Sequence, residues 1–355
     1  MILLLATMLA VQIGPPGTDA PAREPQMAVR GSTVALTFGA GNSIYFSLST
    51  DSGRTFSVPK KVVDAPVIPL THHRGPRITF AGDAIVITAV WGNADAGGPH
   101  AHGLPPAGDL FALRSADLGK TWSKPVVIND LPGAATEGLH ALASDGKAEL
   151  FAAWLDGRAG NGKKLYGSQS SDGGVTWSKN VLIYESPAGT ICECCHPSVA
   201  IAPDGEILVM WRNWLDGSRD MYLAQSRGGV RFSTPRKLGL GTWKLNACPM
   251  DGGGIAIAGG KIVTAWRREH QIFLASPGAA ERQIGEGTDV AVAGSAAGLY
   301  AAWSTAAGIR VLRPGSSDPA VLAPRGSFPS LAALSGGSAV AAWEDGGKIV
   351  VEQLR

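Results

Sequence analysis

Three features that would narrow the function at once are missing from this chain of 355 residues. It has no long basic run and a formal net charge of only +2, so nucleic acid is not expected as a partner. No segment after the N-terminus is apolar for long enough to span a bilayer. Long helical patterns are also absent. The chain is 45% apolar and holds 47 Gly and 23 Pro, which is typical of many short strands joined by tight turns.

The N-terminus carries one apolar segment, MILLLATMLAVQIG. It reads as the core of a secretory signal, although no Lys or Arg precedes it. We expect residues 1–20 to be a signal peptide or, failing that, an early strand. A secreted or periplasmic location follows from the first interpretation. The even number of cysteines, four, suits an oxidising compartment.

An internal repeat is the strongest signal in the sequence. Each unit has a short strand, a stronger strand that often ends in Ala-Trp, a third strand and a Gly-rich turn. Seven copies are found, with second strands TVALTF, IVITAVW, LFAAW, ILVMW, IVTAW, LYAAW and AVAAW. The third strands are IYFSLS, LFALRS, LYGSQS, MYLAQS, IFLAS, IRVLR and IVVEQL. Small sheets stacked radially would protect the edges of so many short strands.

Three copies carry a fuller turn signature, STDSGRTFS, SADLGKTWS and SSDGGVTWS. Their aspartates, Asp51, Asp117 and Asp172, can accept backbone N–H bonds inside the turn, which predicts a structural role. This signature resembles the Asp-box, or BNR, repeat of the sialidase superfamily. The resemblance implies a single all-β domain over residues 21–355, a β-propeller of four-stranded antiparallel blades.

The blade count is seven by the repeats, with six as the alternative because sialidases usually have six. The seventh copy stops after three strands. Its fourth strand could come from the N-terminal segment near VQIG. The runs CECCHPSV, WRNWLDGSRDMYLAQS and TWKLNACPMDGG also resemble a bacterial, secreted, sialidase-like subgroup.

The first strand of each propeller blade lines a central channel, where ligands favour the concave mouth. Aligning the seven first strands on their apolar pattern gives one column that holds a cation, a histidine and a carboxylate. The column is Gln26, Arg77, His140, Ser198, Gly254, Asp289 and Ser330. The residues that precede it are also polar and include His72, His73, Arg74, Glu137, Asp251 and Glu286.

The cysteines lie in two loops that should be adjacent on this rim. Cys192, Cys194 and Cys195 enter the fourth blade, and Cys248 enters the fifth. Three interpretations stay open: two disulfides, a Cu or Zn site completed by His196, or a reactive nucleophile.

The sialidase resemblance implies a carboxylate-binding arginine triad, a Tyr nucleophile with a Glu partner, and an Asp acid. Arg77-Ile78 matches part of the family's Arg-Ile-Pro motif, and Arg212 and Arg267 could complete the triad. The five tyrosines do not fall at the position that the family uses.

Candidate catalytic residues are Glu137, Asp251 and Asp289, and candidate substrate-binding residues are Arg74, Arg77, His140, Arg212 and Arg267. We expect a monomeric protein that cleaves or binds a sialic-acid-like or other acidic sugar. The alternatives are a metal-binding or redox propeller and a non-catalytic scaffold.

Overall fold

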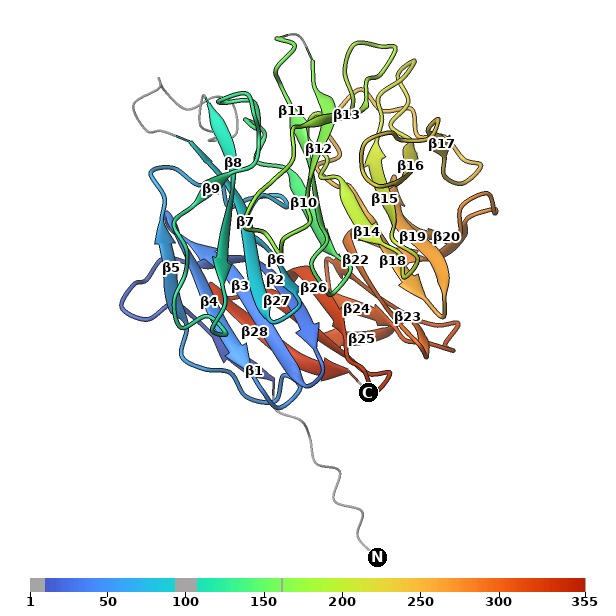
Figure 1. Ribbon diagram of the computed structural model, residues 1–355. Coiled ribbons are helices and arrows are strands. Elements are labelled where there is room, and N and C mark those ends of the chain that lie inside the picture. The colour runs from blue at the N-terminus through green and yellow to red at the C-terminus, as the bar shows by residue number, and fades with distance from the viewer. Residues whose placement is uncertain (1–9, 93–106, 161, 355) are drawn as a thin grey trace, which may run out of the picture.

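The computed structural model describes residues 10–92, 107–160 and 162–354. Within these ranges the chain forms seven four-stranded antiparallel sheets and no helix. The sheets stand around a ring, so the predicted seven-bladed propeller is confirmed (Figure 1). None of the described segments is a helix that is long and apolar enough to cross a membrane.

The inner strands of the seven blades contact one another around the ring and enclose a channel. They are β2 (Ala22–Arg30), β6 (Arg77–Ala81), β10 (His140–Ser144), β14 (Ser198–Ile201), β18 (Gly254–Ala258), β22 (Thr288–Ser295) and β26 (Ser327–Ala333). We call the end where these strands begin the channel mouth and the end where they finish the turn end.

The second strands form the core because neighbouring blades cover both of their faces. They are β3 (Thr33–Ala40), β7 (Ala84–Gly92), β11 (Leu150–Asp156), β15 (Glu206–Arg212), β19 (Lys261–Arg268), β23 (Gly298–Thr305) and β27 (Ala339–Asp345). Six of them contain the repeat's tryptophan, which is buried in every case, as at Trp154 and Trp211. Burial on both faces explains why these segments are continuous apolar runs instead of alternating ones.

The third strands are β4 (Ser43–Ser49), β8 (Gly108–Ser115), β12 (Lys164–Ser170), β16 (Met221–Arg227), β20 (Gln271–Ala275), β24 (Gly308–Leu312) and β28 (Lys348–Leu354). The outer strands are shorter: β5 (Lys60–Asp64), β9 (Val126–Val127), β13 (Val181–Tyr184), β17 (Arg236–Lys237), β21 (Arg282–Glu286) and β25 (Ala320–Ala323). Short, exposed outer strands limit pairing with other chains.

The outer strand of the last blade comes from the other end of the chain. β1 (Val11–Ile13) pairs with β28, with Val11 opposite Val351 and Ile13 opposite Ile349. The N-terminal segment therefore closes the ring, as the three-stranded seventh copy predicts (Figure 1). Residues 1–9 of the expected signal segment lie outside the described residues.

The turns that follow β4, β8 and β12 lie at the turn end. In each of them the aspartate accepts bonds from both the backbone N–H and the hydroxyl of the threonine four residues later, as Asp172 does from Thr176. Burial alone would raise the pKa of Asp172, but the bonds from Thr176 lower it to about 2. Gly119 has φ +80°, and a Cβ there would collide with the Phe46 ring. The Trp122 ring packs edge-on against Phe46 of the neighbouring blade at 5.3 Å.

Candidate functional site

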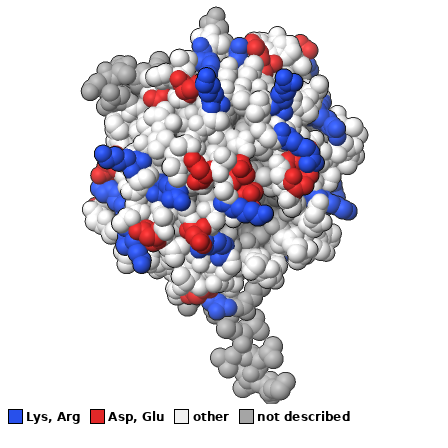
Figure 2. All heavy atoms as spheres, in the orientation of Figure 1, with Lys and Arg blue, Asp and Glu red and all other residues white. Residues whose placement is uncertain are grey.

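A cavity of about 180 Å³ lies in the half of the channel next to the mouth. Polar side chains from several blades line it: Gln26, His73, Arg77, His196, Ser198, Asp289 and Ser330. Amide and hydroxyl groups of this kind suit the hydroxyls of a small polar ligand. Figure 2 shows acidic and basic side chains interspersed on the face drawn, without an extended field of one sign.

His140 does not belong to this lining, which corrects the column read from the sequence. The β10–β11 register pairs His140 with Trp154, whereas Ser198 pairs with the residue before Trp211. His140 is therefore one position out of step, and Ala141 lines the cavity instead. The His140 ring is fully buried with its Nε2 at 3.0 Å from Thr88 Oγ1. Burial lowers the pKa of His140 to about 3, so the ring is neutral.

Asp289 and His73 form a close pair on the cavity surface. Asp289 Oδ1 lies 3.0 Å from His73 Nε2, and both side chains are 14% exposed. Burial alone would raise the pKa of Asp289, but the hydrogen bond and charge of His73 lower it. Burial alone would lower the pKa of His73, but the bond and charge of Asp289, with Glu24 and Asp251 nearby, raise it. The opposite shifts of the two pKa values favour an ion pair, with a carboxylate facing an imidazolium.

Two buried carboxyl groups stand behind this pair. Asp251 Oδ2 accepts the backbone N–H of Asp289 at 3.0 Å, while its Oδ1 is buried without a hydrogen-bond partner. Burial, together with the charge of Asp289, raises the pKa of Asp251. Glu24 Oε1 accepts the backbone N–H of His73 at 2.9 Å, and burial raises the pKa of Glu24 to about 7. Carboxyl groups whose pKa values are pushed apart are a property of acid–base sites.

The backbone at the mouth is unusual. Glu24, His73, Asp289, Phe328 and Met250 all have φ between +51° and +65°. In β2, β22 and β26 the pairing register shifts at the same place, because one extra residue enters the inner strand. Left-handed non-glycine residues are uncommon and cost free energy, and they gather at functional sites.

His196 belongs to the cavity rather than to the cysteines that precede it. Its Nε2 lies 3.1 Å from Gly253 O, and its ring centroid is 4.2 Å from that of His73. Burial lowers the pKa of His196, and the charges of His73 and Arg77 lower it further. A neutral ring thus lies tilted, at an interplanar angle of 37°, against His73.

The three arginines of the expected triad do not converge on the cavity. Arg212 is 1% exposed and donates to the backbone carbonyls of Asp251, Arg219 and Arg267. Arg267 donates to the carbonyls of Glu269 and Pro249. Only Arg77 lines the cavity, and part of its guanidinium bonds the carbonyl of His73. None of the five tyrosines lines this cavity either.

Glu137 and Arg74 lie together on the rim, away from the cavity lining. Glu137 Oε1 is 3.2 Å from Lys163 Nζ, and its Oε2 is 3.7 Å from Arg74 Nη2. Of the three predicted catalytic carboxylates, the structure brings Asp251 and Asp289 together and places Glu137 apart from them.

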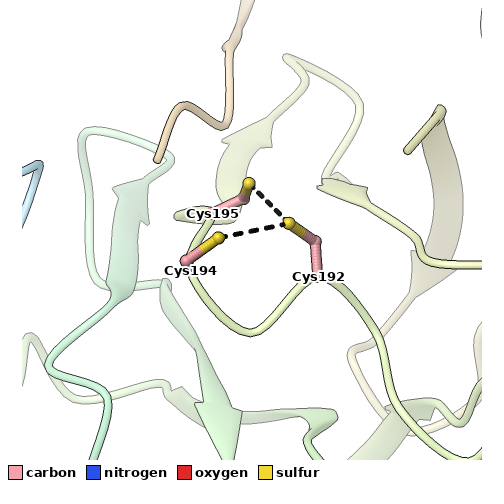
Figure 3. A group of neighbouring side chains, drawn as sticks. All are labelled: Cys192, Cys194 and Cys195. Atoms are coloured by element: carbon pink, nitrogen blue, oxygen red, sulfur yellow. Dashed lines mark hydrogen bonds between the residues drawn. The ribbon is translucent and has the colours of Figure 1, made fainter. Parts of the chain in front are cut away.

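The cysteines of the fourth blade form a buried cluster next to the mouth. The Sγ atoms of Cys192, Cys194 and Cys195 lie within 4.8 Å of one another, and Figure 3 shows them pointing toward a common centre. Cys248 is exposed and interacts with Cys194. Burial alone would raise the pKa of Cys192, but bonds from the other two thiols and the charges of Arg212 and Arg219 lower it. All four cysteines are unbridged within the described chain.

Two contributors to the mouth were not picked out as catalytic by the sequence. His73 is a loop residue next to another histidine, and Glu24 precedes the aligned column by two positions. Glu24 could have been predicted from the run EPQ at the start of an apolar strand. A carboxyl group buried there needs hydrogen-bond or charged partners.

No family model matches the chain, and no curated protein matches it either. Solved structures share the fold at low identity. A Dyadobacter fermentans protein of unknown function aligns over 98% of both chains with 16% identity and a TM-score of 0.58. A Penicillium chrysogenum α-L-arabinanase aligns over 97% of both chains with 14% identity and a TM-score of 0.58. An intramolecular trans-sialidase from Ruminococcus gnavus aligns over 94% of both chains with 12% identity and a TM-score of 0.52. The chain thus shares its propeller fold with these three proteins.

Proposed function

We propose that the protein is a glycoside hydrolase that acts on a small glycoside at the channel mouth. The observation that carries the proposal is the 3.0 Å pair of Asp289 and His73 on the cavity surface. The His73 imidazolium would donate a proton to the leaving oxygen and, as a neutral imidazole, would then take a proton from the attacking water, while Asp289 orients the ring and stabilises its charge.

The rest of the mouth supports these two roles. Asp251 and Glu24, the carboxyl groups with raised pKa values, lie behind the pair and hold their protons more readily than exposed acids. Gln26, Ser198 and Ser330 offer hydrogen bonds to sugar hydroxyls. The small cavity favours a single sugar residue over an extended chain.

The sequence resemblance adds the finer proposal that this sugar is acidic, as in sialosides. Arg77 supports it as a cation in the lining. Because Arg212 and Arg267 are held by backbone carbonyls, a neutral sugar such as an arabinoside is an equal candidate. The trans-sialidase and the arabinanase named above represent the two choices.

The test is a panel of aryl sialosides, arabinofuranosides and hexosides offered to the purified protein. We expect release of the aryl group from at least one member, and loss of that release in Asp289→Asn. Asp83→Asn is the matched control because Asp83 is exposed and, within the described residues, forms an ion pair only with Arg30. The proposal is refuted if the panel shows no turnover and no saturable binding, or if Asp289→Asn keeps full activity.

A further inference from the structure

The cysteine cluster is a second site, separate from the cavity. Its three buried thiols come from one loop that the rest of the fold holds in place. The backbone N–H of Cys192 donates to Arg212 O at 3.1 Å, and that of Ile191 donates to Lys163 O at 3.0 Å. Met250, from the next blade, packs against the cluster.

Positive charge surrounds these sulfurs. Arg219 Nη1 lies 3.2 Å from Cys192 Sγ, and Arg212 also acts on Cys192. Arg74, whose side chain is 1% exposed, acts on Cys194 and Cys248. Arg74 Nη1 is buried and has no hydrogen-bond partner among the described residues.

Three guanidinium groups around neutral thiols would be an unbalanced arrangement, because a buried charge is costly unless it is paired. Glu137 is 3.7 Å from Arg74, but no carboxylate forms an ion pair with Arg212 or Arg219 in the described chain. The three arginines therefore favour a negatively charged group at the sulfurs.

We propose that Cys192, Cys194 and Cys195 bind one soft metal ion, Zn²⁺ or Cu⁺, and that Cys248 closes the site from the solvent side. A thiolate complex of either ion carries net negative charge, which the three arginines would balance. Thiolates prefer these ions over hard cations. His196 is not a ligand in this proposal, because its ring faces His73 and Gly253.

The sulfur positions are close to what such an ion needs. In a tetrahedral zinc site with bonds of about 2.3 Å, neighbouring sulfurs are about 3.8 Å apart. Cys192 and Cys194 are 3.7 Å apart. Cys192 and Cys195 are 2.7 Å apart, so the Cys195 side chain must turn outward by roughly 1 Å to complete the site.

The competing occupant is a disulfide between Cys192 and Cys195. It would leave the sulfurs uncharged, so Arg219 would have no negative charge at Cys192, and Arg74 would keep Glu137, at 3.7 Å, as its counter-charge. The arginine shell is thus the observation that favours a metal–thiolate centre over a bridge.

The test uses the full chain, reduced under anaerobic conditions, stripped with a chelator and then offered Zn²⁺ or Cu⁺ alone. Native mass spectrometry should show one ion per chain in the wild type. Cys194→Ser, at the more exposed edge of the cluster, should lose it. Arg219→Met should keep its fold and bind the ion roughly 10–100-fold more weakly, as expected for a group that supports the ligands.

Two further variants sharpen the result. Cys248→Ser should weaken Zn²⁺ binding, because water would replace the fourth thiolate, and should weaken Cu⁺ binding less, because three thiolates can hold that ion. Asp289→Asn is the control for a change at the cavity and should bind either ion as the wild type does. The proposal is overturned if the reduced wild type retains neither ion, or if Cys194→Ser binds as tightly as the wild type.

Discussion

At the channel mouth the inner strands and their loops place His73, Asp289 and Arg77 against a small cavity. At the turn end the same strands line a second cavity, of about 400 Å³, mainly with apolar or small residues such as Ile78 and Ala333. One architecture therefore presents two different surfaces within a single channel. The charged side chains of the candidate site lie at the end where the loops enter the inner strands.

The backbone shows the same contrast. The turn end repeats one device in three blades, an aspartate that accepts bonds from its own turn. The mouth is less regular: different blades contribute an arginine, an aspartate, histidines and serines, and several of its residues hold left-handed φ values. The regular turns stabilise the propeller, whereas the irregular starts of the inner strands hold the candidate site residues. Variants at each end of the channel test this contrast, and we take them from the largest expected effect to the smallest.

The largest effect should come from His73→Gln, which removes the proton donor and leaves Asp289 without its counter-charge. On the best substrate from the panel we expect kcat to fall about 10²–10⁴-fold. Loss of the basic limb of the wild-type pH–rate profile should accompany it, because that limb reports the raised pKa of His73. An unchanged profile would remove His73 from the mechanism.

The second effect concerns stability at the mouth. Glu24 titrates at about 7 when folded against 4.5 as its ordinary value, so the unfolded chain loses this proton first as pH rises. The free energy of unfolding should fall between pH 4.5 and 7 by about 3 kcal/mol and then level off. Glu24→Gln should lack this fall, as measured by denaturant titration at several pH values. An identical pH dependence in both proteins would show that Glu24 is not buried as described.

A smaller effect is expected at the turn end from Asp172→Ala. This change removes the acceptor for Val175 N–H, Thr176 N–H and Thr176 Oγ1. We expect unfolding to become easier by about 1–2 kcal/mol, with kcat unchanged. The turn after β16, QSRGGVRFS, has Arg227 at the matching position, and this side chain forms only an exposed ion pair with Asp204 among the described residues. Arg227→Ala is therefore the control and should leave stability nearly unaltered. Loss of activity in Asp172→Ala would contradict the separation of the two ends.

The smallest effect should come from Glu137→Gln. The sequence offered Glu137 as a catalytic carboxylate, but the structure pairs it with Lys163 and Arg74 on the rim. We expect kcat to change less than about threefold, since changes outside the reacting groups remove no transition-state contact. A loss as large as that of His73→Gln would return Glu137 to the active site.

Most of the fold could be predicted from the sequence because its signal is local. The ends of each repeat's second and third strands are found within two residues of their predicted places. The closure of the ring by β1 follows from a seventh copy that is one strand short.

The site could be predicted only in part. Asp289, Arg77 and the clustered cysteines follow from their places at the starts of the inner strands. His140 was misplaced by one position because the apolar pattern of β10 does not fix its pairing register with β11. The pairing of His73 with Asp289 and the approach of Arg219 to Cys192 depend on loop conformations that no spacing rule encodes.

The most direct test of the account is a crystal structure of Asp289→Asn with the best glycoside of the panel bound. We expect the sugar in the mouth cavity, with its glycosidic oxygen within about 3.2 Å of a ring nitrogen of His73. A sugar bound at the turn end, or on the outer surface with the mouth empty, would contradict it.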